Sequence, residues 1–156
     1  MRNIPSHIHH FSWHSKISFE LPIRFEEQDE DPDTNSAIYA DDLDDDDELG
    51  AKVLAKATAV PENQNDAYRL LALESAKLPD RNTESFVECS VDGAPAVQQT
   101  LVYEQADIGI QVLRHETFAQ IGNIVFSLTC LAPAARAEEY IPAFDHAAST
   151  ARFVLL

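Results

Sequence analysis

The 156-residue sequence has only four glycines, and they lie far apart. Dinucleotide-binding and phosphate-binding loops need several glycines within a few residues, because the backbone must approach the phosphates closely. Neither motif is present, and the Gly-x-Ser-x-Gly turn of serine hydrolases is also missing. His115 and Glu116 lack the second histidine of a zinc protease motif. We therefore predict no catalytic residues, although a site assembled from distant residues would leave no local motif.

Cysteine is equally scarce: Cys89 and Cys130 are the two in the chain, and neither has a nearby Cys or His in the sequence. A disulfide framework or a zinc site needs more ligands at shorter spacing. Both cysteines fall in apolar segments, where a free cysteine behaves as a small buried hydrophobe. We predict no cofactor and a reducing, cytoplasmic location. The lack of an apolar run of about 18 residues or of a signal-peptide core leads to the same expectation.

Basic residues are missing from one stretch, in which 13 acidic residues lie between Glu26 and Glu48 without a Lys or Arg. The formal net charge is −16, and outside this stretch 14 acidic residues face 11 basic ones. Such a surface repels nucleic acids and anionic membranes, and it attracts a protein with a basic surface. We expect a solvated loop at the end of the stretch. The predicted partner-binding residues are Asp41, Asp42, Asp44, Asp45, Asp46, Asp47 and Glu48.

The same stretch contains weak candidates for a metal site. Asp29, Asp31 and Asp33 alternate as the first ligands of a calcium-binding loop do. The pattern then breaks, because Thr34 replaces the turn glycine and Ala40 stands where the bidentate glutamate is needed. Specific calcium binding is therefore not expected.

Residues 1–15 are predicted to form an N-terminal arm that is partly flexible, because their polar and apolar residues follow no clear period. Imidazoles at short spacing suit transition metals, so the arm would have weak, adventitious affinity for them. Residues 16–156 are predicted to form one domain, since a chain of this length buries about 70% of its surface on folding. The histidines of the arm are His7, His9, His10 and His14.

Apolar alternation and turn residues predict an antiparallel sheet of six or seven strands with helices packed on it, an α+β fold. The expected strands are residues 17–21, 36–40, 51–60, 85–91, 96–105, 109–118 and 123–131. The expected core includes Phe19, Leu21, Leu71, Val112, Phe126, Leu128 and Phe144.

Two helices complete the prediction. The first spans about 65–77, begins at Asn63 or Asn65 as cap, and carries an apolar stripe into which Glu74 intrudes at the edge. The second spans about 138–151, with Pro142 in its first turn, where the missing N–H has no partner to lose. The residues expected to be buried are Ala67, Leu70, Leu71 and Leu78 in the first helix, and Ile141, Phe144 and Ala148 in the second.

Three short motifs carry a resemblance to a known family. They are Phe19-Glu20-Leu21-Pro22 with Phe25, Val125-Phe126-Ser127-Leu128-Thr129 followed by Glu139-Tyr140-Ile141-Pro142-Ala143-Phe144, and the closing Ala151-Arg152-Phe153. With these motifs residues 17–153 resemble the PsbP-like superfamily, which includes Ran-binding Mog-type and bacterial DcrB-type and Eag-type domains. The resemblance implies an α-β-α sandwich that binds other proteins and is not generally catalytic.

The sequence thus predicts a non-catalytic protein-binding domain, of the adaptor or chaperone kind, whose acidic loop steers a basic partner. Two alternatives remain. One is a cation-dependent enzyme that uses the acidic stretch, which would require carboxylates converging on a pocket. The other is a homodimeric scaffold, in which the acidic stretch serves solubility.

Overall fold

The computed structural model describes residues 7–12, 14–41, 50–77, 82–105 and 109–154. Its main feature is a seven-stranded antiparallel sheet, as predicted, in the order β3-β4-β5-β9-β8-β7-β6. A smaller antiparallel sheet has the order β1-β2-β10. The large sheet consists of β3 (Phe25–Asp31), β4 (Ser36–Asp41), β5 (Lys52–Ala59), β6 (Asn82–Val91), β7 (Ala94–Gln105), β8 (Ile110–Ile121) and β9 (Ile124–Pro133). The small one consists of β1 (His7–Ser12), β2 (Ile17–Pro22) and β10 (Arg152–Phe153).

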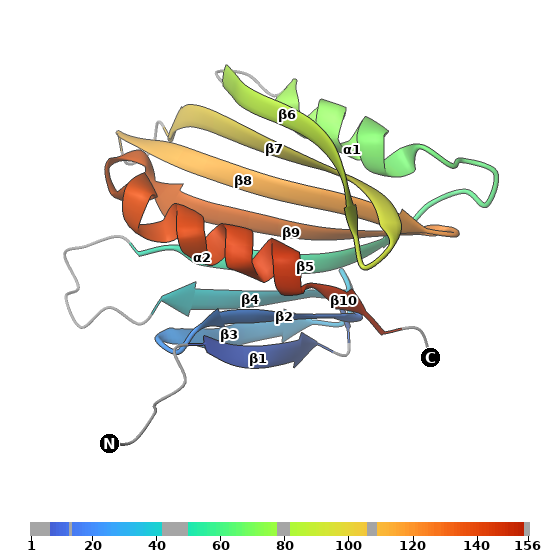
Figure 1. Cartoon of the computed structure of the whole chain (residues 1–156), viewed down its shortest axis with the longest axis horizontal. Coiled ribbons are helices and arrows are strands. Elements are labelled where there is room, and N and C mark those ends of the chain that lie inside the picture. The colour runs from blue at the N-terminus through green and yellow to red at the C-terminus, as the bar shows by residue number, and fades with distance from the viewer. Residues whose placement is uncertain (1–6, 13, 42–49, 78–81, 106–108, 155–156) are drawn as a thin grey trace.

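The large sheet is covered on both faces (Figure 1). Helix α2 (Ala137–Thr150) and the small sheet lie on one face, called here the inner face. Helix α1 (Ala67–Ala76) packs on the opposite, outer face against β7 and β8. Neighbouring residues such as Val125 and Phe126 therefore belong to different cores, because side chains alternate across a strand.

The inner core is the larger of the two. It joins aromatic side chains of β2, β4, β9 and α2 and has few polar atoms. Phe19 meets Tyr39 edge-on at 5.2 Å between ring centroids, and Phe144 stacks beside Tyr140 at 6.1 Å. Of the predicted core residues, all except the partly buried Leu71 are buried.

Helix α1 lies where the sequence predicts a helix, but its cap and buried stripe differ. Asp66 occupies the cap position, and its side chain makes no capping hydrogen bond. The helix buries Tyr68 and Ala72 beside Ala67, whereas Leu70 is 39% exposed. The stripe is rotated because the large Tyr68 ring covers the sheet. Leu78 lies outside the described residues.

Helix α2 also lies where expected, with two corrections. Ile141 is exposed, while Phe144 and Ala148 are buried as predicted. A short 3-10 helix, η1 (Ala134–Arg136), precedes α2, so Pro142 falls in the second turn of the α-helix and not in the first. The proline lies on the solvent side next to the exposed Glu138, where water can hydrate the carbonyl group that lacks its intrahelical N–H partner.

Two segments without an apolar period are strands. Residues 7–12, expected in an irregular arm, form β1 and pair with β2, while residues 1–6 lie outside the described part. The polar stretch that starts at Phe25 forms β3 at the edge of the large sheet. No helix in the described ranges is long and apolar enough to cross a membrane.

Candidate functional site

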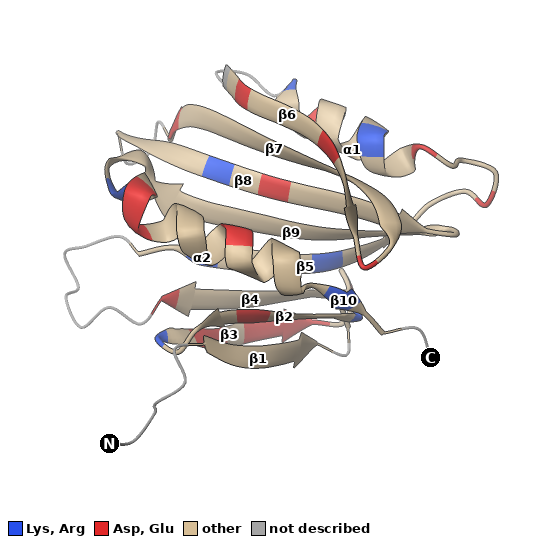
Figure 2. Cartoon of the chain, in the orientation of Figure 1, with Lys and Arg blue, Asp and Glu red and all other residues tan. Residues whose placement is uncertain are grey.

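The acidic stretch of the sequence is divided by the structure. Its first part is the edge strand β3, in which five of seven residues are acidic. Much of the β3 ribbon is coloured as acidic residues (Figure 2). Glu26, Glu27 and Asp29 are exposed, and in the described part of the chain no Lys or Arg forms an ion pair with them. Strand β3 therefore gives the sheet an edge of uncompensated negative charge.

The carboxylates of β3 point to both faces of the sheet. Glu27 lies opposite Tyr39, whose side chain is on the inner face, whereas Asp29 lies opposite the outward-facing Ile38. A bulge between Glu27 and Asp29 shifts the register. Glu30 faces inward and accepts hydrogen bonds from the Ser12 hydroxyl at 2.6 Å and the His14 backbone N–H at 3.3 Å. The exposed carboxylates are thus divided between the two faces, with Glu26 and Asp29 on the outer face and Glu27 on the inner face.

The calcium candidates bind their own backbone. Asp29 Oδ1 accepts from the Glu30 N–H at 2.9 Å, and Asp31 Oδ1 accepts from the Asp33 N–H at 2.9 Å. Within the ranges that the structure describes, no three His, Cys, Asp or Glu side chains are grouped as metal ligands.

We expect millimolar calcium or magnesium to leave the thermal midpoint unchanged relative to an EDTA-treated control. A calcium ion needs about six to eight oxygen ligands, and a ligand that binds the folded state stabilises it. Thermal unfolding monitored by circular dichroism across a calcium titration measures this. A saturable rise of the midpoint at micromolar calcium would contradict the expectation.

Asp41 differs from the other predicted partner-binding residues because its side chain is fully buried at the end of β4. The Arg24 Nε atom lies 3.0 Å from Asp41 Oδ2, and the Tyr140 hydroxyl donates to the same oxygen. Burial and this hydrogen bond raise the pKa of Tyr140 to about 12. The expected solvated loop therefore does not include Asp41. Asp42, Asp44, Asp45, Asp46, Asp47 and Glu48 lie outside the described residues.

Two arginines flank the Asp41–Tyr140 pair: Arg24, in the turn between β2 and β3, and Arg136, at the end of η1. The Arg24 and Arg136 guanidinium carbons lie 5.2 and 5.1 Å from the centroid of the Tyr140 ring. Both arginines also bind Glu139, whose pKa is lowered first by the hydrogen bond from Arg136. Cation–π and ion-pair contacts together fix the side chains around Asp41 at the end of β4.

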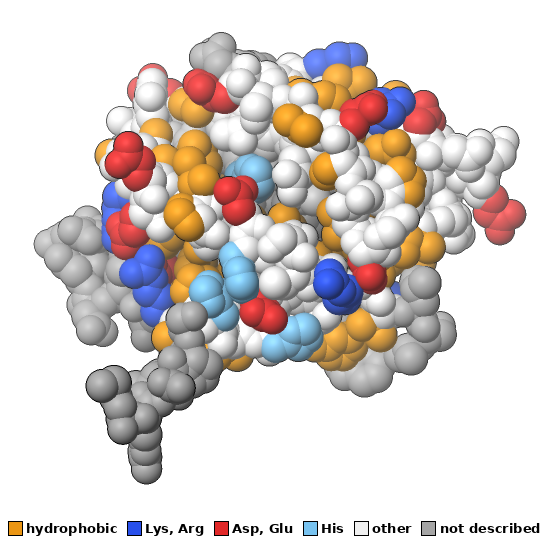
Figure 3. Space-filling view, viewed as in Figure 1, with side chains coloured by type: hydrophobic (Ala, Val, Ile, Leu, Met, Phe, Trp, Pro, Cys, Tyr) orange, Lys and Arg blue, Asp and Glu red, His pale blue; other side chains and the backbone are white. Residues whose placement is uncertain are grey.

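Three of the four predicted arm histidines, His7, His9 and His10, lie on β1. His7 stacks on His146 of α2 at 4.0 Å, and His146 Nε2 lies 2.9 Å from the Glu20 carboxylate. His10 packs against Tyr39 at 4.9 Å, and burial lowers its pKa. Histidines gather on the face that carries β1 and α2 (Figure 3). They do not form a common metal site with the described acidic residues or cysteines.

Both cysteines are free thiols in strands, as predicted. Burial raises the pKa of Cys89, which is half-buried, and of Cys130, which is fully buried. A thiol with a raised pKa is a poor nucleophile because little of it is thiolate at neutral pH. Burial thus disfavours the thiolate form of both cysteines.

Sequence reasoning missed a buried polar cluster on the outer face, called here the Glu116 cluster. Glu116 of β8 is 1% exposed. Its Oε1 atom accepts from the Ser75 hydroxyl at 2.6 Å and from Gln99 Nε2 at 3.0 Å, while Arg114 Nε lies 3.0 Å from Oε2. Ser75, Arg114 and Glu116 line a hollow of about 400 Å³. Leu54, Lys56 and Glu74 line it as well. The predicted position of Glu74 at the edge of the α1 footprint is confirmed, since its side chain is exposed.

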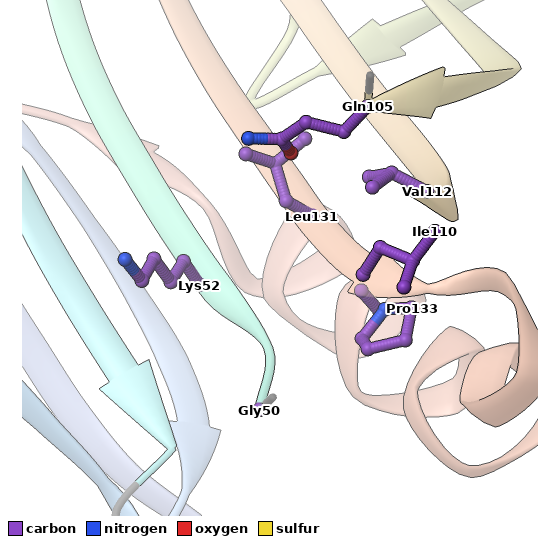
Figure 4. A pocket seen from close by; sticks show the side chains of 8 residues that line it. Gly50, Lys52, Gln105, Ile110, Val112, Leu131 and Pro133 are labelled. Carbon is purple, nitrogen blue, oxygen red and sulfur yellow. The ribbon is translucent and has the colours of Figure 1, made fainter. Parts of the chain in front are cut away.

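A second hollow of about 330 Å³ lies nearby at the ends of β5, β8 and β9 (Figure 4). Ile110, Val112, Leu131 and Pro133 give it an apolar floor, and Lys52 lies at its side. Lys52 is the one charged residue of its described lining, which contains no carboxylate, histidine or cysteine. Neither hollow is lined by the β3 carboxylates.

No protein-family model matches the chain, and a search of curated proteins found no match. Solved structures do match. The Ran-binding protein Mog1p of Saccharomyces cerevisiae is similar over 95% of this chain and 95% of its own, at 10% identity and a TM-score of 0.68. LpqN of Mycobacterium tuberculosis, involved in cell envelope biogenesis, is similar over 89% of this chain and 83% of its own, at 12% identity and a TM-score of 0.74.

The cyanobacterial PsbP protein CyanoP of Synechocystis is similar over 97% of this chain and 94% of its own, at 12% identity and a TM-score of 0.66. At such identities a likeness establishes the fold alone. The chain therefore has the fold of the PsbP-like superfamily, as the motifs in its sequence predicted.

Proposed function

We propose that this chain is a non-catalytic, adaptor-like binding domain that receives a protein with a basic surface on its acidic edge. The proposal rests on one observation above all, the exposed carboxylates of β3 that lack a described cationic partner. Exposed charges of one sign attract an oppositely charged protein over the Debye length, about 8 Å at physiological ionic strength. The same proposal includes the acidic residues 42–48 and a cytoplasmic location, which suits two free cysteines.

Two further observations favour binding over catalysis. The β3 carboxylates are divided between the two faces of the sheet and, among the described residues, form no group of three ligands, whereas a cation-dependent enzyme needs them to converge on one ion. Mog1p, which has this fold, is described as a Ran-binding protein. Protein binding is thus compatible with the architecture.

We expect removal of charge from β3 to slow association. The variant Glu26→Gln, Glu27→Gln, Asp29→Asn should lower the association rate by about 3- to 10-fold, because steering depends on charge near the contact. The partner is first isolated by pulldown from native extract at low and high salt. Association rates are then measured by stopped flow or surface plasmon resonance across a salt series.

The matched control removes three exposed carboxylates elsewhere, in the variant Glu62→Gln, Glu104→Gln, Glu138→Gln. Its net charge equals that of the β3 variant, so it separates local steering from overall charge. Equal rates and equal salt slopes for the two variants would contradict the proposal. Asp44→Ser, Asp45→Ser, Asp46→Ser and Asp47→Ser together test the remaining acidic residues, and we expect stability to be equal or slightly higher.

A further inference from the structure

The seven-stranded sheet has a second edge, strand β6, whose chemistry is the opposite of that of β3. Among its ten residues only Glu84 and Glu88 are charged. Phe86 is 40% exposed, and Val87, at 54%, exceeds every other exposed large hydrophobic residue of the described chain. Natural edge strands are protected from pairing by charge, proline or an added cover. The centre of β6 lacks the first two.

The turn after β6 shows which backbone groups face outward. Asp92 and Gly93 have φ values of 50° and 80°, as in a two-residue type I′ turn. Such a turn is closed by a pair that exchanges both hydrogen bonds, here Val91 and Ala94, and hydrogen-bonded pairs recur at every second residue. The N–H and C=O groups of Phe86 and Glu88 therefore point away from β7. Among the described residues no backbone hydrogen bond reaches them.

We propose that β6 pairs antiparallel with β6 of a second copy of this chain, with Val87 facing Val87 of that copy on a two-fold axis. Opposing residues then share a face of one continuous sheet, and Phe86 lies opposite Glu88 of the second copy. The outward N–H and C=O groups of these two residues become hydrogen-bonded pairs. The two-fold axis makes the contact isologous and closed, so pairing stops at a dimer.

Charge selects this register over its neighbours. A centre at Phe86 brings Glu84 toward Glu88 of the second copy, and a centre at Glu88 opposes two copies of the same carboxylate. Like charges directly opposite each other destabilise a strand pair. With Val87 at the centre, Phe86 instead meets Glu88, which is already paired with Arg69 of α1. The guanidinium group of Arg69 in one copy is then near the Phe86 ring of the other copy, and a cation next to an aromatic ring is favourable.

The β3 edge of the large sheet is not suited to pairing with a second copy. Pairing two copies of β3 would bring together two strands that each carry five carboxylates. Self-association is therefore directed to β6, and β3 stays accessible for the basic partner. The dimer does not depend on the proposed function, because each edge is tested by its own variants.

The oligomeric state tests the proposal. We expect light scattering and sedimentation to give twice the chain mass of 17.4 kDa for the wild type. Val87→Glu should raise the dissociation constant by about 100-fold or more, since like charges at an interface cost several kcal/mol. Ile38→Glu, at an exposed apolar residue of β4, should leave the dimer intact. A monomeric wild type, or a dimer that survives Val87→Glu, would overturn the proposal.

Cross-linking tests the register and does not depend on how Val87→Glu folds. In a Cys89→Ser background, Val87→Cys should form a disulfide-linked dimer rapidly, because residues facing each other across a non-hydrogen-bonded pair have close Cβ atoms. Phe86→Cys should cross-link much more slowly, since its counterpart lies two residues along the strand. Faster cross-linking through residue 86 than through residue 87 would refute the register.

Discussion

Replacing Phe144 with alanine is expected to lower the free energy of unfolding by about 3–5 kcal/mol. Phe144 is 1% exposed, and its side chain extends from α2 into the core on the inner face of the large sheet. Truncation leaves a cavity beside Tyr140, whose hydroxyl must stay bonded to Asp41 and therefore cannot move in to fill it. For a domain of this size each kcal/mol lowers the thermal midpoint by about 2–4 °C. Chemical and thermal denaturation monitored by circular dichroism measure both quantities.

The matched control is Ile141→Ala, three residues earlier in the same helix. Ile141 is 38% exposed, and surface substitutions usually change stability by about 0.5 kcal/mol or less. An Ile141 effect equal to that of Phe144 would show that the apolar face of α2 is not the one described.

Strands with one buried face were predictable from the sequence because their period is local. In β5, Val53, Ala55 and Ala57 are buried while Lys52 and Lys56 face the other side. Strand β3 gave no such signal, since four of its seven residues are exposed and acidic residues occupy both faces. It is a strand because β4 pairs with it, and pairing between strands does not depend on local hydrophobic alternation.

The candidate site was predictable only in part, because a sequence shows local charge but not the contacts between distant residues. Counting charges found the acidic stretch, but it did not separate Asp41 from its neighbours. The hydroxyl that binds Asp41 comes from Tyr140, 99 residues away in the sequence. The edge strand β6 was predicted as a strand, yet only the strand order shows that it is an edge. Position within a sheet is a property of the whole fold and leaves little trace in one segment.

The alternation of residues along β8 contains a sign of the Glu116 cluster. Glu116 and Arg114 share the alternation phase of Val112 and Phe118, which are both buried, so two opposite charges lie between apolar residues on one face of β8. The Glu116 partners Gln99 and Ser75 lie 17 and 41 residues away in the sequence. The phase of β8 thus pointed to a buried charge, while only the assembled sheet and α1 show how it is neutralised.

Replacing Glu116 with leucine is expected to destabilise the chain by about 3–5 kcal/mol, the usual effect of removing one partner from a buried ion pair. The change leaves the mostly buried Arg114 guanidinium group without its counter-charge, and the Ser75 hydroxyl and the Gln99 amide each lose an acceptor. An unpaired charge in a site of low dielectric constant is the largest of these penalties. Denaturant unfolding at neutral pH measures the loss.

A double-mutant cycle identifies the cause. Arg114→Leu combined with Glu116→Leu should be more stable than Glu116→Leu alone, because replacing a whole buried ion pair with apolar residues is often neutral or stabilising. The cycle also includes Arg114→Leu alone. If the ion pair were unimportant, the stability losses of the two single variants would add, and the double variant would be the least stable of the three. Recovery in the double variant would instead show that the cost of Glu116→Leu is the uncompensated charge of Arg114, its neighbour on β8.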